Sequence, residues 1–301
     1  MEFFSHDDVL ARLSPAAAVD ALRAALKAGF DPATDLQREK VALQRGQMHI
    51  MPSSLPRVSG IKVLTLQPED HDPSLPLIQG QYLLFDGATL APAAVLDGAA
   101  LTALRTPAVS IAGVKPLLTR GEGELKVAIF GTGAQGVGHA ETIASVLNGV
   151  RAARFSYISR RPADLPGWVQ AGSSEAQNAV AEADLVVCAT TSSSPLISLA
   201  DVRPDAVVIA VGSHTVNARE VASDLMGAAN VIVEDIEVAL REAGDVVLAI
   251  EEGALPQSAL LPMKDVVTGA VALDPARPTV FKTVGMPWED LVVADAVVGA
   301  R

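Results

Sequence analysis

A loop with three glycines at regular spacing is the segment of this chain best suited to chemistry. Residues 127–130 form an apolar run that predicts a strand, Gly131, Gly133 and Gly136 follow as G-x-G-x-x-G, and helix-forming residues begin at Val137. Between a strand and a helix, the first glycine allows a tight turn, the second lets the backbone approach a pyrophosphate, and the third lets the helix pack on the strand. The phosphates would bind the free N–H groups at the helix N-terminus. The spacing therefore predicts a dinucleotide site and, with it, hydride transfer.

The end of the next predicted strand indicates which dinucleotide binds. In this fold that strand end meets the adenosine ribose, and a carboxylate there favours NAD. Here the strand 155–159 ends at Ser159 and continues into Arg160 and Arg161, with no carboxylate before Asp164. Two guanidiniums and a hydroxyl suit a 2′-phosphate, so NADP(H) is favoured over NAD(H). The alternative is a solvated basic turn.

The elements around this loop alternate between strands and helices. A capping box at Ser174 opens one of the helices. This cadence predicts the α/β class, with a Rossmann-type doubly wound parallel sheet in a dinucleotide-binding domain at 121–279. The predicted strands are 127–130, 155–159, 185–189, 207–211 and 231–233, and the predicted helices are 137–148, 174–182 and 218–227.

The two chain ends show a different pattern. A helix from Ser5 to Phe30, restarting at Ser14, is followed by strand-like segments and a helix that ends before the glycine-rich linker 120–124. Late in the chain a strand at 279–285 and a helix at 288–298 are expected to return to this part. We therefore predict a second, α+β domain from 1–120 and 280–301. Its predicted strands include 60–66 and 79–85, and its second long helix is 99–119.

Composition excludes several classes of protein. The formal net charge is −12 and no basic cluster follows a face, so a nucleic-acid partner is not expected. The single cysteine, Cys188, excludes a disulfide framework and zinc–cysteine sites. No signal peptide and no membrane-length apolar run is apparent, so a cytoplasmic protein without a membrane partner is expected. His71, in the acidic segment 69–72, is interpreted as part of a solvated loop, and no metal site is expected.

Several segments, in order along the chain, resemble the ornithine cyclodeaminase/mu-crystallin family. The R-T element and the late segment are specific, because they are not general features of dinucleotide-binding folds. The matching segments are Gly60-Ile-Lys62 with Leu75–Gly80, similar to a conserved-lysine segment; Leu101–Ala108, similar to L-T-x-x-R-T-A-A; Gly131–Gln135, similar to G-x-G-x-Q; and Phe281–Gly285 before Glu289-Asp290, similar to F-x-S-x-G…E-D.

The resemblance implies a homodimer that acts on a small imino or amino acid, in which the α+β domain from both chain ends is the substrate-binding and dimerisation domain. By motif, Lys62 would contact the substrate carboxylate and the reacting nitrogen, and Arg38 would clamp that carboxylate. Arg105 would lie between coenzyme and substrate with Thr106 beside it, and Val284 would contact the substrate. The remaining residues expected to bind coenzyme are Gly131, Gly133, Ala134, Gln135, Gly136, Ser159, Arg160, Arg161, Thr190, Val211, Gly212 and Thr283.

Two departures from the family pattern favour one of its activities. Where cyclodeaminases carry an acidic proton carrier and a second glutamate, this chain has His214 and His49. Releasing ammonia from ornithine needs those acids, whereas a reductase needs one proton donor, which an imidazole can be. We therefore expect a reductase of cyclic ketimines, in which Δ1-pyrroline-2-carboxylate or Δ1-piperideine-2-carboxylate gives L-proline or L-pipecolate. The alternatives are an ornithine cyclodeaminase or alanine-type dehydrogenase, or a catalytically silent crystallin-like protein that binds NADP.

Overall fold

The chain forms two compact units. The computed structural model describes residues 1–68, 74, 76 and 78–300. Unit 1 comprises Met1–Ala108 and Gly285–Arg301, and unit 2 comprises Val109–Val284. The first division falls inside one helix, α3 (Gly98–Thr119), which is shared by both units.

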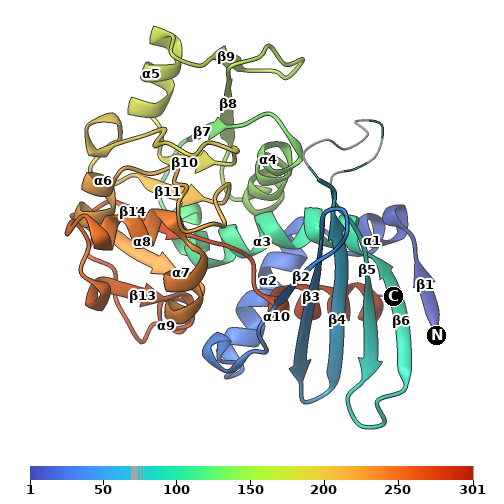
Figure 1. The fold of residues 1–301 in the computed structure, drawn as a ribbon. Helices are drawn as coiled ribbons and strands as arrows, with labels where there is room; N and C mark the ends of the chain where they lie inside the picture. Colours follow the sequence, from blue (N-terminus) through green and yellow to red (C-terminus); the bar gives the residue numbers. More distant parts are fainter. Residues whose placement is uncertain (69–73, 75, 77, 301) are drawn as a thin grey trace. The chain divides into compact units, whose positions relative to one another are not determined.

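Unit 1 contains a six-stranded sheet in the order β1-β6-β5-β4-β3-β2. Strands β2 to β6 pair antiparallel, and β1 pairs parallel with β6. Figure 1 shows the long strands β3, β4 and β5 side by side, with α10 running across them. The strands are β1 (Glu2–Phe4), β2 (Glu39–Ala42), β3 (Gln47–Leu55), β4 (Val58–Leu66), β5 (Ile78–Asp86) and β6 (Pro92–Asp97).

The helices of unit 1 cover one face of this sheet. Helix α2 begins at a Ser14 cap with Pro15 in its first turn, as a restarting helix should. Side chains alternate along the strands, so Met51, Lys62 and Tyr82 lie in one buried row on the face that α10 covers. The helical elements are α1 (His6–Arg12), α2 (Pro15–Lys27), the 3-10 turn η1 (Pro32–Thr34), the first part of α3 and α10 (Pro287–Gly299).

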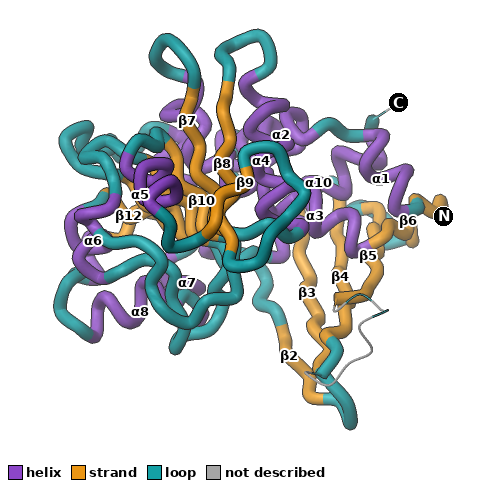
Figure 2. The backbone as a smooth tube through the Cα atoms, turned by 90° about the horizontal axis from the view of Figure 1, so that it is seen from above, coloured by secondary structure: helices purple, strands orange, loops and turns teal. Residues whose placement is uncertain are grey.

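Unit 2 contains an eight-stranded sheet in the order β13-β12-β14-β11-β10-β7-β8-β9, with every pair parallel. Strand β7 lies between β8 and β10, so the strand order reverses there, and Figure 2 shows these three strands together. The predicted fold class is confirmed. The strands are β7 (Leu125–Phe130), β8 (Ala153–Ser159), β9 (Trp168–Gln170), β10 (Leu185–Cys188), β11 (Val207–Ala210), β12 (Asn230–Val233), β13 (Leu260–Pro262) and β14 (Thr279–Lys282).

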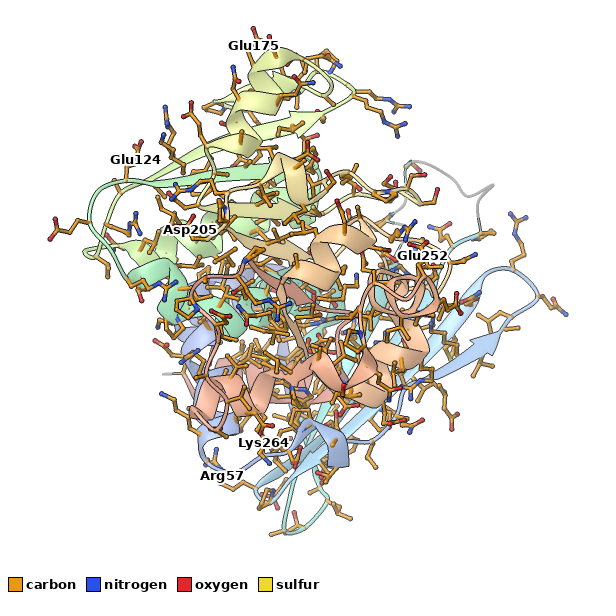
Figure 3. The ribbon with its side chains drawn as sticks, turned by 90° about the vertical axis from the view of Figure 1, so that its left-hand side faces the viewer. Arg57, Glu124, Glu175, Asp205, Glu252 and Lys264 are labelled. Carbon is orange, nitrogen blue, oxygen red and sulfur yellow. The ribbon has the colours of Figure 1, made fainter. Side chains whose placement is uncertain are left out.

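The helices of unit 2 are short apart from α4, which follows the glycine loop. The carboxylates Glu124, Glu175, Asp205 and Glu252, labelled in Figure 3, all belong to unit 2 and are exposed. The helical elements are α4 (Ala134–Leu147), α5 (Ser174–Ala181), η2 (Leu199–Asp201), α6 (Ser223–Ala228), α7 (Ile236–Glu242), α8 (Gly244–Glu251), η3 (Gln257–Ala259) and α9 (Met263–Thr268). No described helix is both long and apolar enough to cross a membrane.

Three local expectations differ from the structure. Strand β14 belongs to the sheet of unit 2, between β11 and β12, so the chain returns to unit 1 only after residue 284. The cap of α5 is Ser173, whose hydroxyl accepts from the Ala176 N–H, rather than Ser174. Helix α6 begins at Ser223 instead of 218, because the N–H groups of Glu220 and Val221 donate to the Asp245 side chain.

Candidate active site

Lys62 forms a buried ion pair with a carboxylate of α10. Its Nζ lies 2.6 Å from Oδ2 of Asp290, and neither side chain is exposed. The same Nζ donates to Oγ1 of Thr102 at 3.4 Å. Burial lowers the pKa of Lys62 from 10.5 to about 8, with Asp290 opposing this shift and Arg105 adding to it. A lysine that titrates near pH 8 can release a proton close to neutral pH, which an ordinary lysine does not.

Arg105 is held by two carboxylates of the same helix. Its Nε donates to Oδ1 of Asp290 at 3.1 Å, and its Nη1 donates to Oε2 of Glu289 at 3.0 Å. The other Glu289 oxygen accepts the Met286 N–H at 2.9 Å, which fixes the carboxylate at the start of α10. Asp290 therefore binds Arg105 and Lys62 at once, and the first turn of α10 sets where both cations lie.

Gly285 lies between two guanidinium groups. Its φ is +80°, and a Cβ there would overlap Nη1 of Arg105. Its carbonyl accepts a hydrogen bond from Nη2 of Arg38. Arg38 is close enough to Lys62 to contribute to the lowered pKa of that lysine. The three cations predicted to contact the substrate, Arg38, Lys62 and Arg105, therefore come together in unit 1.

Asp35 is a second carboxylate at the start of α10, and it is half-buried. Its Oδ2 accepts the Trp288 N–H at 2.8 Å, and its Oδ1 accepts the Ser53 hydroxyl at 2.7 Å. An acceptor at these positions satisfies one of the free N–H groups of the helix N-terminus. Burial raises the pKa of Asp35 from 3.8 to about 6, and Asp290 acts in the same direction.

His49 and Thr106 belong to the same unit. His49 lies on β3, 7% exposed, with Nε2 3.5 Å from Oε1 of Gln47. It is on the sheet face that carries Met51, and Met51 pairs directly with Lys62. Thr106 follows Arg105 on α3 and is half-buried.

The glycine loop of unit 2 has the geometry of a pyrophosphate cradle. Gly131 has φ +111°, and a Cβ there would overlap the carbonyl oxygen of Ala189, which follows β10, so the turn from β7 into α4 requires glycine. A Cβ at Gly136 would overlap the carbonyl oxygen of Gly131, which shows how closely α4 approaches β7. A Cβ at Gly133 would meet no described atom within 4 Å, so the backbone N–H groups at the start of α4 are open to a ligand.

A pocket of about 1050 Å³ surrounds this loop. Arg160 and Arg161 line it together with Ser159 at the end of β8, and no acidic residue is among its described lining residues. The Ser159 hydroxyl donates to the Arg161 carbonyl at 2.6 Å and accepts from Trp168 Nε1 at 2.9 Å. Ser159 therefore shapes the basic turn that carries both arginines.

A buried network joins the loops that follow β10, β11 and β14. The Glu220 carboxylate accepts the Thr190 N–H, the Thr190 hydroxyl and the Gly212 N–H, each at 2.7 Å. Asp245 accepts the N–H of Glu220 at 2.7 Å and lies 3.1 Å from Nζ of Lys282. Lys282 also donates to the Ser213 carbonyl. Burial raises the pKa of Glu220, while its hydrogen bonds lower it.

The two residues after β14 are fixed by hydrogen bonds to the ends of the neighbouring strands β11 and β12. The Thr283 N–H donates to the Ala210 carbonyl at 3.1 Å, and the Val284 N–H donates to Oε2 of Glu234 at 2.8 Å. Val211 and Gly212 are half-buried at the end of β11. His214 is exposed on the loop that follows.

Helix α4 carries the last predicted coenzyme residues. Ala134 and Gln135 form its first turn, directly after Gly133. His139, one turn later, is fully buried, and Nδ1 lies 2.7 Å from the Gln135 carbonyl oxygen. Burial lowers the pKa of His139 to about 4, so this imidazole is neutral at physiological pH.

The whole chain matches one protein family. The ornithine cyclodeaminase/mu-crystallin family is matched over residues 5–300. The chain belongs to this family. The resemblance predicted from its motifs is thereby confirmed.

Two similar proteins of known sequence are named as reductases. Mouse ketimine reductase mu-crystallin is 32% identical over 262 residues, which cover 85% of this chain and 81% of the relative. A Δ1-pyrroline-2-carboxylate reductase of Bacillus thuringiensis subsp. konkukian is 33% identical over 249 residues, covering 78% and 75%.

Solved structures share the fold. A probable ornithine cyclodeaminase from Bordetella pertussis is 27% identical with a TM-score of 0.81, covering 99% of this chain and 96% of that one. Δ1-pyrroline-2-carboxylate reductase of Thermococcus litoralis, solved with NADH and L-proline, has a TM-score of 0.83 at 23% identity and covers 99% and 96%. At that identity the second match shows the fold alone.

Sequence reasoning on this family member missed the acidic half of the site. Glu289 and Asp290 belong to a motif but no role was predicted for them, and Glu220, Asp35 and Asp245 were not predicted at all. One signal was available, because Lys62 lies between apolar residues of a predicted strand and a buried lysine needs a carboxylate. In the described part of the chain no cluster of three or more His, Cys, Asp or Glu side chains could hold a metal ion, and His71 lies outside the described residues.

Proposed function

We propose that this family member is an NAD(P)H-dependent oxidoreductase that reduces cyclic ketimines. The substrates would be Δ1-pyrroline-2-carboxylate or Δ1-piperideine-2-carboxylate, and the products L-proline or L-pipecolate. The observation that carries the proposal is the Lys62–Asp290 pair beside Arg38 and Arg105, in a chain that also has a dinucleotide loop. The names of the mouse and Bacillus relatives, ketimine reductase and Δ1-pyrroline-2-carboxylate reductase, support it.

The chemistry needs a hydride at the imine carbon and a proton at the imine nitrogen. The bound coenzyme would supply the hydride. Arg38 and Arg105 would bind the substrate carboxylate, since guanidinium groups match carboxylate geometry. The Lys62 ammonium would give one proton to the nitrogen, become a neutral amine and regain its proton from solvent, leaving a secondary amine and oxidised coenzyme.

Lys62 is the proton donor that we favour among three candidates. It is buried between Asp290 and the arginines, and its pKa of about 8 leaves the ammonium populated at neutral pH yet able to release a proton. His49 and His214 are the other candidates.

For the coenzyme we propose a preference for NADP(H). The pocket around the glycine loop has two arginines and no carboxylate among its described lining residues. The 2′-phosphate of NADP(H) would accept charge-assisted hydrogen bonds from Arg160 and Arg161. NAD(H) lacks this phosphate and could not form them. The loops fixed by Glu220, with Thr190 and Gly212, would hold the nicotinamide end, and the cytosol is the compartment that we propose for the reaction.

We further propose that the protein is a homodimer joined through the open face of the unit 1 sheet. The residues of this face alternate with the buried row that carries Lys62, and they are half-buried and mostly apolar. A second copy with the same face would cover them, as a two-fold interface requires. The face includes Met48, Ile50, Ile61, Val63, Leu83, Phe85 and Val95. Ile61→Lys should give a monomer in light scattering, and an unchanged mass would reject this interface.

The decisive test is turnover of the purified protein. NADPH oxidation should accelerate with Δ1-pyrroline-2-carboxylate or Δ1-piperideine-2-carboxylate, and chromatography should find L-proline or L-pipecolate as product. Ammonia release from L-ornithine, or turnover only with L-alanine and NAD⁺, would replace the proposal with another activity. Coenzyme binding without any turnover would indicate a silent protein.

A further inference from the structure

Tyr82 is a buried polar residue in the same row as Lys62. It pairs directly with Lys62 across β4 and β5, so the two side chains leave the same face of the sheet next to each other. Tyr82 is 0% exposed, and its hydroxyl has no hydrogen-bond partner among the described residues. A buried hydroxyl without a partner is costly, and phenylalanine would fill the same space without that cost.

The backbone makes room for this hydroxyl. A Cβ at Gly60, two residues before Lys62, would overlap the Tyr82 oxygen and lie 2.6 Å from Cε1 and 2.7 Å from Cζ. The phenol ring therefore lies across β4 at Gly60. Glycine in a strand interior weakens the strand, because it has no side chain to pack and its backbone is more flexible in the unfolded chain. Making room for the phenol at Gly60 therefore costs stability.

The surroundings of Tyr82 keep its hydroxyl protonated. Burial raises the pKa of Tyr82 well above 10, and the carboxylates of Asp290 and Asp35 add to the shift. Both carboxylates already bind other donors, since Asp290 holds Lys62 and Arg105, and Asp35 holds Ser53 and the start of α10. The Tyr82 O–H is therefore a donor on the strand partner of Lys62, with no acceptor of its own among the described residues.

We propose that Tyr82 is a further substrate-binding residue, whose hydroxyl donates a hydrogen bond to the carboxylate of the imino acid bound at Lys62. The inference rests on the proposed function, which makes a cyclic imino acid the ligand. Once its nitrogen is protonated, such a molecule has no acceptor except its carboxylate. Tyr82 and Lys62 pair directly on the same face of the sheet, so a substrate that reaches the lysine also comes close to the tyrosine side chain.

The chain offers a matched control, because its only other tyrosine is Tyr157 on β8 in unit 2. Tyr82→Phe should raise the KM for Δ1-pyrroline-2-carboxylate about tenfold, the usual effect of losing a hydrogen bond to a charged group. In Tyr82→Phe the KM for NADPH should stay unchanged and the melting temperature should not fall. Tyr157→Phe should leave the KM values for both the imine and NADPH unchanged. An unchanged imine KM in Tyr82→Phe would overturn the proposal.

A second measurement needs no turnover. In the Tyr157→Phe variant, a ¹³C label at Cζ of tyrosine reports Tyr82 alone by NMR. Pyrrole-2-carboxylate, a flat analogue that cannot be reduced, should shift this signal when Lys62 is intact. When Lys62→Met is added to the same variant, the analogue should no longer shift it. A signal that stays in place at saturating analogue, with saturation shown by a raised melting temperature, would also overturn the proposal. If the wild-type protein reduces no cyclic imine, the proposed function fails, and the analogue titration still decides the role of Tyr82.

Discussion

The ammonium of Lys62 lies 2.6 Å from the carboxylate of Asp290, and both side chains are shielded completely from solvent. The two residues are 228 positions apart in the sequence, so the pair forms only when α10 has docked on the sheet of unit 1. Removing two charges from water is costly, and a buried pair repays this cost only through close geometry and further hydrogen bonds. Thr102 and Arg105 supply those bonds.

Replacing Lys62 by methionine should abolish reduction without unfolding the protein. Asp290 keeps Arg105 as a partner, so we expect a loss of about 3 kcal/mol of stability, at the lower end for a broken buried pair. The imine reductase rate should fall at least about a hundredfold, since both a substrate contact and the proton donor are lost. Lys27→Met, at an exposed position on α2, is the control. Chemical denaturation and NADPH oxidation measure the two effects, and near-normal turnover in Lys62→Met would remove the lysine from the mechanism.

The pH profile should identify the proton donor. Burial lowers the pKa of Lys62 to about 8, and the ammonium form that donates the proton is present below that pH. The value of kcat/KM should therefore be steady at neutral pH and fall about tenfold for each pH unit above 8. Asp290→Asn removes the charge that opposes this shift, so the fall should begin at lower pH. A profile that breaks near pH 6.5, and keeps that break in Asp290→Asn, would instead indicate His49 or His214.

Short-range patterns in the sequence predicted the framework of this fold well. The apolar runs at 127–130 and 185–189 are strands because buried parallel strands are continuously apolar, and the glycine loop needs only its own residues to form. Strands of unit 1 such as β3 and β6 were not predicted. The pattern of β3, with polar His49 and Ser53 on its buried face, does not alternate between apolar and polar residues.

Long-range pairing accounts for what was missed in the site. Lys62, Arg105 and Arg38 were found because they lie in motifs, but the carboxylates that hold Lys62 and Arg105 come from α10. Asp35, before β2, in turn binds the start of that helix. A strand lysine shows that an acidic partner must exist without showing which of the 35 acidic residues it is. The roles assigned to the individual site residues remain predictions.

Gly285→Ala should damage the substrate site while leaving coenzyme binding intact. The backbone has φ +80° there, a conformation that costs an L-residue about 1 kcal/mol, and the added methyl would overlap the Arg105 guanidinium. Arg105 would have to move away from Glu289 and Asp290. We expect the imine KM to rise at least about tenfold through the lost charged hydrogen bonds. Gly269→Ala also places alanine at φ +80°, in open surroundings, and should lose stability without the KM effect. Equal imine KM values in the two variants would contradict this role for Gly285.

Arg160→Asp should reverse the coenzyme preference. The change removes one phosphate contact and sets a negative charge against the 2′-phosphate, so the ratio of kcat/KM for NADPH over NADH should fall about a hundredfold. Arg154→Asp, at the opposite end of β8 and paired with Glu124, is the control and should keep the wild-type ratio. If the ratio is the same in wild type and Arg160→Asp, the basic turn is not the ribose site.

Glu220→Gln should weaken coenzyme binding through the loops that the carboxylate joins. The amide that replaces one oxygen points a donor at either the Thr190 or the Gly212 N–H, so one backbone donor loses its acceptor at a cost of about 1–3 kcal/mol. Gly212 and Thr190 are in such close contact that a Cβ at Gly212 would overlap the Thr190 carbonyl oxygen. A displacement of one loop should therefore displace the other. We expect the KM for NADPH to rise about tenfold, with a smaller change in the imine KM. Glu242→Gln, another buried carboxylate of unit 2, is the matched control for stability. Fluorescence titration with NADPH measures the affinity directly, and equal affinities in the two variants would mean that Glu220 supports the fold of unit 2 without positioning the coenzyme.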